Sequence, residues 1–327
     1  MSAESTGSAE PETRAAPGAE PPALCEPRPA ADPAPGGTVP SGAGAQSGGP
    51  APARGTTGAG GPAVLAEADA LPLLRAGAFE LEGRLVDASN TTLRGFVTLD
   101  GVTARCVYKP IRGERPLWDF PDGTLAGREV AAYLVSRATG WGLVPPTVLR
   151  DGPLGPGACQ LWIDEPADGS PPVGFVPTFE LPADWFRVAA ARDDEGNAYA
   201  LAHADDPRLA RLAVLDAVIN NADRKGGHIL AGPDGRIYGV DHGISFHVED
   251  KLRTVLWGWS GRRLPAEAAE MLDGLATALA GQLADDLAEH LTISEVARSA
   301  ERVRRLRDTG RFPPPPQDWP AVPWPPM

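Results

Sequence analysis

Asp223 and Asp241, with His228 between them, are residue types that can handle a metal-bound phosphate. Carboxylate oxygens and imidazole nitrogens are ligands that Mg²⁺ or Mn²⁺ accepts in proteins. Phosphoryl transfer requires one carboxylate to orient the attacking hydroxyl group and another to hold the metal that bridges the phosphates. Within residues 209–247, Asp223 suits the first task and Asp241 suits the second.

The elements around these two residues explain how they could meet. Apolar residues recur at helical spacing up to Asn220, where an amphipathic helix is expected to end. Two short strands, residues 229–231 and 236–240, flank a Pro-Asp-Gly turn, which is a strong hairpin signal. Because the open ends of a hairpin lie side by side, Asp223 and Asp241 are expected to be neighbours.

A simpler interpretation uses the same residues. Asp223 and Arg224 would form a salt bridge within a turn, and Asp241 would cap the end of a strand. Two acidic positions joined by a hairpin, with several histidines nearby, favour a functional site over this alternative. Three of the five histidines of the chain occur in this stretch, at His228, His242 and His247.

The motifs Asn221-Ala-Asp223-Arg224 and Val240-Asp241-His242-Gly243 resemble the catalytic loop and the metal-binding loop of the phosphatidylinositol 3-/4-kinase superfamily. Within that superfamily, the chain resembles bacterial phosphatidylinositol-kinase-like proteins over residues 79–308. The superfamily shares its fold with the protein kinases. The resemblance therefore implies an α+β, two-lobed, protein-kinase-like fold with a small antiparallel-sheet N-lobe and a mainly helical C-lobe.

Lys109 ends a predicted strand, and the helix that follows, capped by Asp122 or Thr124, carries Glu129. The resemblance implies that the Lys109 ammonium contacts the nucleotide phosphates and that Glu129 pairs with it. Alternatively, Lys109 faces solvent and Glu129 pairs with Arg128 on the surface. The order of lysine strand, helix, catalytic loop and metal-binding loop favours the kinase-like interpretation.

Nucleotide contacts are expected in two further places. A polar turn between strands 79–86 and 93–99 would lie over the phosphates and contribute Ser89, Asn90 and Thr91. The second strand of a later pair would run past the adenine and contribute Gln160, Leu161, Trp162 and Ile163. An ordinary hairpin turn and core packing of Trp162 are the respective alternatives.

The resemblance implies an ATP-dependent phosphotransferase that uses Mg²⁺ or Mn²⁺ and moves the γ-phosphoryl group to a hydroxyl of a lipid, protein or small molecule. Where the superfamily has a metal-binding Asn five positions after the catalytic Asp, this chain has His228, so we expect it to bind the metal with Asp241. Two alternatives remain open. One is a nucleotide-binding pseudokinase that acts as a regulatory or interaction protein. The other is a metal-dependent phosphohydrolase built on Asp223, His228, Asp241 and His242.

The composition narrows the possible partners. The 327 residues include 30 Lys and Arg against 43 Asp and Glu, a net charge of −13. Such a chain is a poor candidate for binding nucleic acid or an anionic membrane surface. Its three cysteines are widely spaced, which predicts neither a disulfide framework nor a zinc knuckle. The sequence predicts neither a signal peptide nor a membrane span, so the expected location is the cytoplasm.

Composition also suggests four segments. Residues 1–63 form an Ala/Gly/Pro-rich tail that is expected to be disordered, since it holds too little apolar surface to bury. The N-lobe covers residues 64–163 and the C-lobe residues 164–310. Residues 311–327 form a Pro/Trp-rich tail, which either serves as a polyproline ligand or packs in extended form on the domain.

Four local expectations complete the prediction. Residues 64–77 should form helical turns broken at Pro72, and residues 164–206 should be rich in loops. Residues 271–287 should form one amphipathic helix. Thr292-Ile-Ser-Glu295 is a capping box that should open the last helix.

Overall fold

The structure is a computed structural model that describes residues 64–85, 90–117, 119–120, 124–167 and 169–327. The predicted disordered tail over residues 1–63 lies outside the described residues. So do Ser89, one of the expected phosphate contacts, and Asp122, one of the two caps considered for the helix that carries Glu129.

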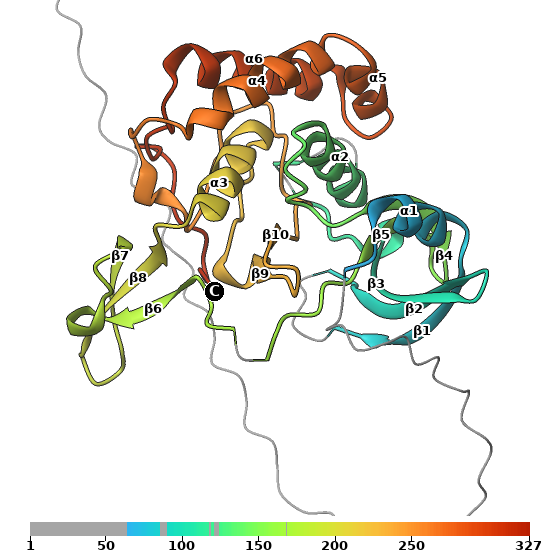
Figure 1. The fold of residues 1–327 in the computed structure, drawn as a ribbon, viewed down its shortest axis with the longest axis horizontal. Helices are drawn as coiled ribbons and strands as arrows, with labels where there is room; N and C mark the ends of the chain where they lie inside the picture. The colour runs from blue at the N-terminus through green and yellow to red at the C-terminus, as the bar shows by residue number, and fades with distance from the viewer. Residues whose placement is uncertain (1–63, 86–89, 118, 121–123, 168) are drawn as a thin grey trace, which may run out of the picture. The chain divides into compact units, whose positions relative to one another are not determined.

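A five-stranded antiparallel sheet forms the first lobe, with its strands in the order β1-β2-β3-β5-β4 (Figure 1). The strands are β1 (Ala78–Arg84), β2 (Leu93–Leu99), β3 (Val102–Pro110), β4 (Thr147–Gly152) and β5 (Gly155–Leu161). β3 is the central strand and pairs with β2 and β5. Lys109, near the end of β3, is therefore held by the most constrained part of the sheet.

Two helices pack with this sheet, α1 (Glu67–Ala76) and α2 (Leu125–Ala138). The predicted break at Pro72 is wrong, since α1 continues through it. Packing of the buried apolar face of α1 offsets the one backbone hydrogen bond that proline cannot donate. α2 begins as predicted at Thr124, whose side-chain oxygen accepts a hydrogen bond from the Gly127 amide at 2.9 Å.

The second lobe is mainly helical. Figure 1 shows α4, α5 and α6 gathered together, with α3 between them and the β9–β10 hairpin. The elements are α3 (Pro207–Ile219), β9 (Ile229–Ala231), β10 (Ile237–Gly239), α4 (Ala266–Leu279), α5 (Gln282–Ala288) and α6 (Ile293–Thr309). Short 3₁₀ helices are η1 (Ile111–Gly113), η2 (Thr178–Glu180), η3 (Gly226–His228) and η4 (Trp257–Trp259). The predicted capping box opens α6, with Thr292 and Glu295 in both of its reciprocal contacts.

Two expectations for this lobe are wrong. The single helix expected over residues 271–287 is divided into α4 and α5, because Gly281 has φ −140° and ψ −137°, which a helix cannot contain. The stretch expected to be rich in loops contains a three-stranded antiparallel sheet in the order β6-β8-β7. Its strands are β6 (Val173–Pro177), β7 (Trp185–Arg192) and β8 (Ala198–Ala204). The periodicity of β7 is weak because a bulge between Arg187 and Ala189 interrupts its register.

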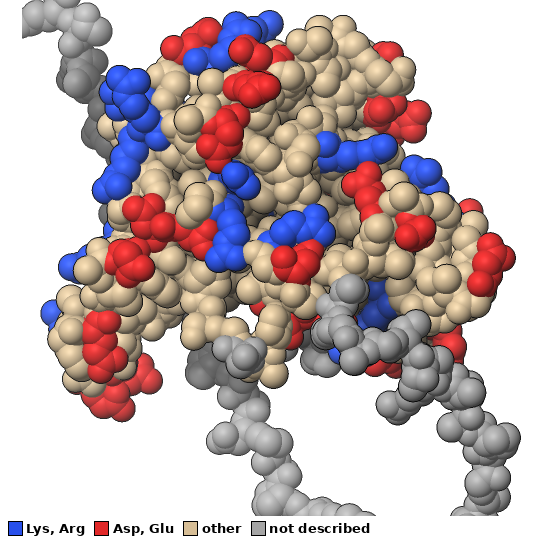
Figure 2. Space-filling model, in the orientation of Figure 1, with Lys and Arg blue, Asp and Glu red and all other residues tan. Residues whose placement is uncertain are grey.

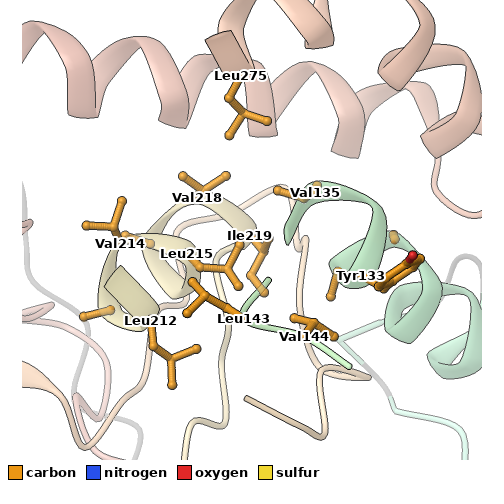
Figure 3. Close-up of a cluster of buried hydrophobic side chains, with 14 of the residues drawn as sticks. Tyr133, Val135, Leu143, Val144, Leu212, Val214, Leu215, Val218, Ile219 and Leu275 are labelled. Atoms are coloured by element: carbon orange, nitrogen blue, oxygen red, sulfur yellow. The ribbon is translucent and has the colours of Figure 1, made fainter. Parts of the chain in front are cut away.

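One buried apolar cluster joins α3 to its surroundings. Figure 3 shows side chains of α3 close to residues of α2, of the segment after it, and of α4. The labelled side chains include Leu212, Leu215, Val218 and Ile219 of α3, Val135 of α2, Leu143, Val144, and Leu275 of α4. Since α3 ends at Ile219, this packing fixes the position from which the loop carrying Asp223 starts.

The predicted α+β fold is confirmed, with a small antiparallel-sheet lobe, a mainly helical lobe and the expected kinase-like order of elements. The segment boundaries proposed from composition stay predictions. Among the described residues, no helix combines the length and the apolar character needed to cross a membrane.

Candidate active site

A cleft of about 150 Å³ brings together most of the side chains predicted to do chemistry. Its lining includes Asn90, Thr91, Lys109, Glu129, Asp223, His228 and Asp241. These residues come from the β1–β2 turn, from β3 and α2, and from the two loops around the β9–β10 hairpin. Residues from both lobes therefore face the same space.

Lys109 is the centre of a three-membered charge cluster. Its Nζ atom donates hydrogen bonds to Glu129 Oε1 and to Asp241 Oδ1, the latter at 2.8 Å. The other Glu129 oxygen accepts the backbone N–H of His242 at 3.0 Å. Glu129 thus connects β3, α2 and the loop that follows β10.

The surface alternative for Glu129 is excluded. Its side chain and that of Arg128 are both buried, at 2% and 1% exposure. Arg128 pairs instead with Glu295 at 2.6 Å and donates to the Ser245 carbonyl oxygen. The two neighbouring residues therefore belong to different networks.

Electrostatics favour the charged forms of Lys109 and Asp241. Burial alone would lower the pKa of Lys109, but the Asp241 and Glu129 carboxylates outweigh it and raise that pKa. The Lys109 ammonium holds the pKa of Asp241 well below its usual range. Burial raises the pKa of Glu129, and Lys109 offsets part of that rise. On the face drawn in Figure 2, basic and acidic side chains are interspersed, so no single sign of charge dominates that surface.

Asp223 lies in the loop that follows α3. The loop is shaped locally, because Asn221 Oδ1 accepts the Asp223 backbone N–H at 2.9 Å. Burial raises the pKa of Asp223, and the Lys225 ammonium, 3.4 Å from Asp223 Oδ2, offsets only part of the rise. A carboxylate with a raised pKa next to a cleft is suited to accept a proton.

Arg224 does not pair with Asp223, so the simple turn salt bridge is also excluded. Arg224 forms a two-pronged pair with Asp216 of α3, with nitrogen–oxygen distances of 2.9 Å and both side chains at 0% exposure. The same guanidinium donates to the carbonyl oxygens of His228 and Val240 and to His242 Nε2. It therefore joins the loop between α3 and β9 to the loop that follows β10.

His228 and Asp241 fit a divalent cation. His228 Nδ1 lies 3.0 Å from the Asp223 carbonyl oxygen, to which it donates, and His228 Nε2 faces Asp241 Oδ2 at 3.3 Å. Burial lowers the pKa of His228 to about 4, so the ring is neutral near pH 7 and Nε2 carries a lone pair. Two acceptor atoms that face each other at this distance are stabilised by a cation shared between them. Among the described residues, no group of three or more His, Cys, Asp or Glu side chains is arranged to hold a metal.

The residues expected to contact the adenine lie outside this cleft. Gln160, Leu161 and Ile163 are buried, and the Gln160 amide donates to Thr147 Oγ1 at 2.8 Å. The Trp162 indole N–H donates to Asp164 Oδ1 at 2.9 Å. None of these four residues lines the cleft described above, so an adenine contact at this strand end stays a prediction.

Sequence reasoning missed two contributors. Glu114 lines the cleft, and its carboxylate accepts the Leu125 and Ala126 amides at the start of α2. Asp216 completes the buried Arg224 network, to which His242 also belongs. Only Asp216 left a signal, as the one acidic residue within the apolar run of α3.

Comparison with known proteins gives one clear relative. Protein Rv2133c of Mycobacterium tuberculosis (strain ATCC 25618 / H37Rv) is 47% identical over 273 residues, which cover 81% of this chain and 98% of the relative. No family model matches the chain.

Several solved kinase structures show partial likeness. The Golgi casein kinase with Mn/ADP bound has a TM-score of 0.48 and 14% identity, covering 74% of this chain and 75% of that one. Hydra Fam20 with sugar has a TM-score of 0.45 and 14% identity, covering 73% and 86%. The Helicobacter pylori proinflammatory kinase CtkA has a TM-score of 0.38 and 8% identity, covering 73% and 94%.

Proposed function

The chain belongs to the family of protein Rv2133c of Mycobacterium tuberculosis, and from the geometry of its cleft we propose that it is an ATP-dependent, kinase-like phosphotransferase. One observation carries the proposal. Lys109, Glu129, Asp223 and Asp241, from four separate elements, converge on one cleft in a lysine–glutamate–aspartate arrangement. This arrangement supplies the parts that phosphoryl transfer requires.

The roles follow from the contacts. Lys109 binds the nucleotide phosphates, and the buried Glu129 holds its ammonium in place. Asp223 accepts the proton of the acceptor hydroxyl as that oxygen bonds to the γ-phosphorus. The bond from the γ-phosphorus to the bridging oxygen breaks, and ADP leaves. Positioning and charge neutralisation supply most of the rate.

Asp241 and His228 would hold Mg²⁺ or Mn²⁺. When bound, the metal would neutralise charge that develops on the transferring phosphate. The His228 imidazole favours Mn²⁺ more than an amide oxygen would. Lys109 would then exchange its contact with Asp241 for a phosphate oxygen while it keeps its contact with Glu129.

Substrate contacts are also proposed. Asn90 and Thr91 line the cleft beside Lys109 and would offer donors to the phosphates. Gln160, Leu161, Trp162 and Ile163 would lie against the adenine. The acceptor is a lipid, a protein or a small molecule, and all three classes are to be screened.

The test is ATP consumption by the purified protein with Mg²⁺ or with Mn²⁺. Asp223→Asn and Asp241→Ala should each abolish turnover, and Asp223→Asn should leave nucleotide binding intact. Asp273→Asn is the matched control, since Asp273 is an exposed residue of α4 outside the cleft lining. Full activity in Asp223→Asn would contradict the assigned base.

Two results would favour the alternatives. A thermal shift with ATP, but no turnover with either metal, would identify a nucleotide-binding pseudokinase. Phosphate release without an acceptor, unaffected by Lys109→Ala, would identify a metal-dependent phosphohydrolase.

A further inference from the structure

The Pro/Trp-rich C-terminal tail packs on the helical lobe, which agrees with the second of the two alternatives predicted for it. Its last residues reach the loop that carries Asp223. Two bonds to one carbonyl oxygen hold its middle. Ala321 accepts the Thr254 amide at 3.0 Å and the Trp257 indole N–H at 2.7 Å. The Trp319 ring lies near Lys251, whose Nζ is 5.2 Å from the ring centre. In Figure 1 the C-terminus lies beside the β9–β10 hairpin.

The last described residues touch the catalytic loop directly. The Pro326 carbonyl oxygen accepts the Gly226 backbone N–H at 2.8 Å. The Met327 side chain covers the Gly226 α-carbon so closely that a β-carbon there would meet its sulfur atom. Gly226 is buried and stands three positions after Asp223 and two before His228. The contact is therefore made between the proposed base and the proposed metal ligand.

A second, indirect contact runs through the segment that the tail holds. Residues 253–255 pair with the catalytic loop, because Arg253 donates its N–H to the Asn221 carbonyl oxygen at 3.0 Å. Its own carbonyl oxygen accepts the Arg224 N–H at 3.0 Å. Thr254, which donates to Ala321, forms a parallel bridge with Arg224. The tail therefore contacts segment 253–255, and that segment in turn contacts the catalytic loop.

The opposite side of the tail faces the three-stranded sheet. Val322, Pro323, Trp324 and Pro326 form one wall of an apolar groove of about 560 Å³. The other wall consists of side chains from β6, β7 and β8, including Phe175 and Tyr199. The tail thus borders an open groove on this side, and it contains no helix or strand of its own.

We propose that residues 319–327, here named the strap, are a positioning element for the catalytic loop, acting chiefly through the Pro326–Gly226 hydrogen bond. The inference rests on the proposed function of Asp223 and His228. In the loop from Ala222 to His228 the only regular element is the three-residue η3, so hydrogen bonds from outside the loop help to decide where its side chains lie. A displacement of about 1 Å at reacting groups can lower a rate by roughly 10²-fold.

A variant that ends at Trp324 tests the strap, because it removes the Pro326 and Met327 contacts and keeps those of Ala321. We expect kcat to fall at least tenfold, while the KM for ATP stays within twofold, since Lys109 and Glu129 are untouched. Hydrogen exchange of the peptide that contains Gly226 should become at least tenfold faster, and Tm should change little. Phe179→Ala is the control, because this side chain is 86% exposed and lies outside both the strap and the cleft lining, so it should leave kcat and exchange unchanged.

Each outcome of these measurements supports or overturns the proposal. Unchanged kcat and unchanged Gly226 exchange in the shortened variant would overturn the proposal. A large fall in Tm with loss of ATP binding would overturn it in favour of a purely structural role. Recovery of kcat when a peptide of residues 321–327 is added would support it. If the wild-type protein shows no turnover, the proposed function fails, and the exchange rates alone then decide whether the strap fixes the loop.

Discussion

Two ion-pair clusters meet at the loop that follows β10, residues 240–243, and they differ in what surrounds them. The Arg224–Asp216 pair is completely enclosed, and its remaining donors bind carbonyl oxygens and an imidazole. The Lys109–Asp241 pair lies in the cleft, with side-chain exposures of 24% and 52%. An enclosed pair cannot reach a ligand and costs much to break, whereas an exposed pair can exchange one partner for a substrate. The first cluster therefore holds two loops together, and the second is available for chemistry.

The largest expected effect is on turnover at the exposed pair. Asp241→Asn should lower kcat by about 10³-fold, because a neutral amide holds a divalent cation poorly. The free energy of unfolding should change by less than about 1 kcal/mol, since the pair is partly solvated. Asn also tolerates the left-handed backbone at this position, where φ is 59°. Coupled-enzyme assays measure kcat, and urea unfolding measures the free energy of unfolding. A stability loss as large as that of an Arg224 variant would contradict the difference between the exposed and the enclosed ion pair.

The enclosed pair should give the opposite result. Arg224→Leu should lower the free energy of unfolding by about 3–5 kcal/mol, because it leaves the Asp216 carboxylate buried without its partner. Arg224→Lys should fall between this variant and the wild type, since an ammonium cannot reproduce the two-pronged contact. Urea unfolding at neutral pH measures both. A loss below about 1 kcal/mol in Arg224→Leu would show that the pair is dispensable for folding.

His203 extends the comparison to a buried neutral group. Its Nδ1–H donates to the Ala204 carbonyl oxygen, and its Nε2 accepts the Gly258 N–H at 3.0 Å. Burial lowers the pKa of His203 below the ordinary value of 6.5. On acidification the unfolded chain takes up this proton first, so stability should fall as the pH drops below about 6.5.

The variant His203→Gln isolates that contribution from those of the other histidines. It should be less stable than the wild type at pH 7.5, and the difference should narrow at pH 5.5. Urea unfolding at the two pH values gives the comparison. A difference that stays constant between them would mean that His203 titrates alike in both states.

The smallest effect is expected at an exposed ion pair outside the cleft. Arg94 and Glu82 pair at 2.8 Å across β2 and β1, with side-chain exposures of 38% and 29%. Glu82→Gln should change the free energy of unfolding by about 0.5 kcal/mol and leave kcat unchanged. Loss of activity would show that exposure of an ion pair, and not its place in the cleft, predicts function.

Much of the fold was predictable because its signals are local. Thr124 and the Thr292–Glu295 capping box mark helix starts within one turn of the chain. The Pro-Asp-Gly turn specified the hairpin in the same way. The three-stranded sheet was missed because its outer strands bury almost no side chains, so they lack the apolar alternation that marks a strand with one buried face.

The sequence also allowed us to predict which residues would lie in the candidate site. Lys109, Glu129, Asp223 and Asp241 were selected from their order along the chain, and the structure gathers them in one cleft. Their catalytic roles stay predictions. The adenine contacts expected at residues 160–163 stay a prediction, since packing around the strand end decides which side chains reach a pocket and none of the four lines the cleft.

The sequence by itself determined which elements form and which charged residues those elements carry. Only the tertiary structure decided the partners: Arg224 with Asp216 and not Asp223, Lys109 with both Glu129 and Asp241, and the tail with Gly226. The physical reason is the distance along the chain between the residues that interact. Capping and turn formation depend on a few neighbouring residues, whereas the Lys109–Asp241 pair joins positions 132 residues apart and forms only after the two lobes have packed.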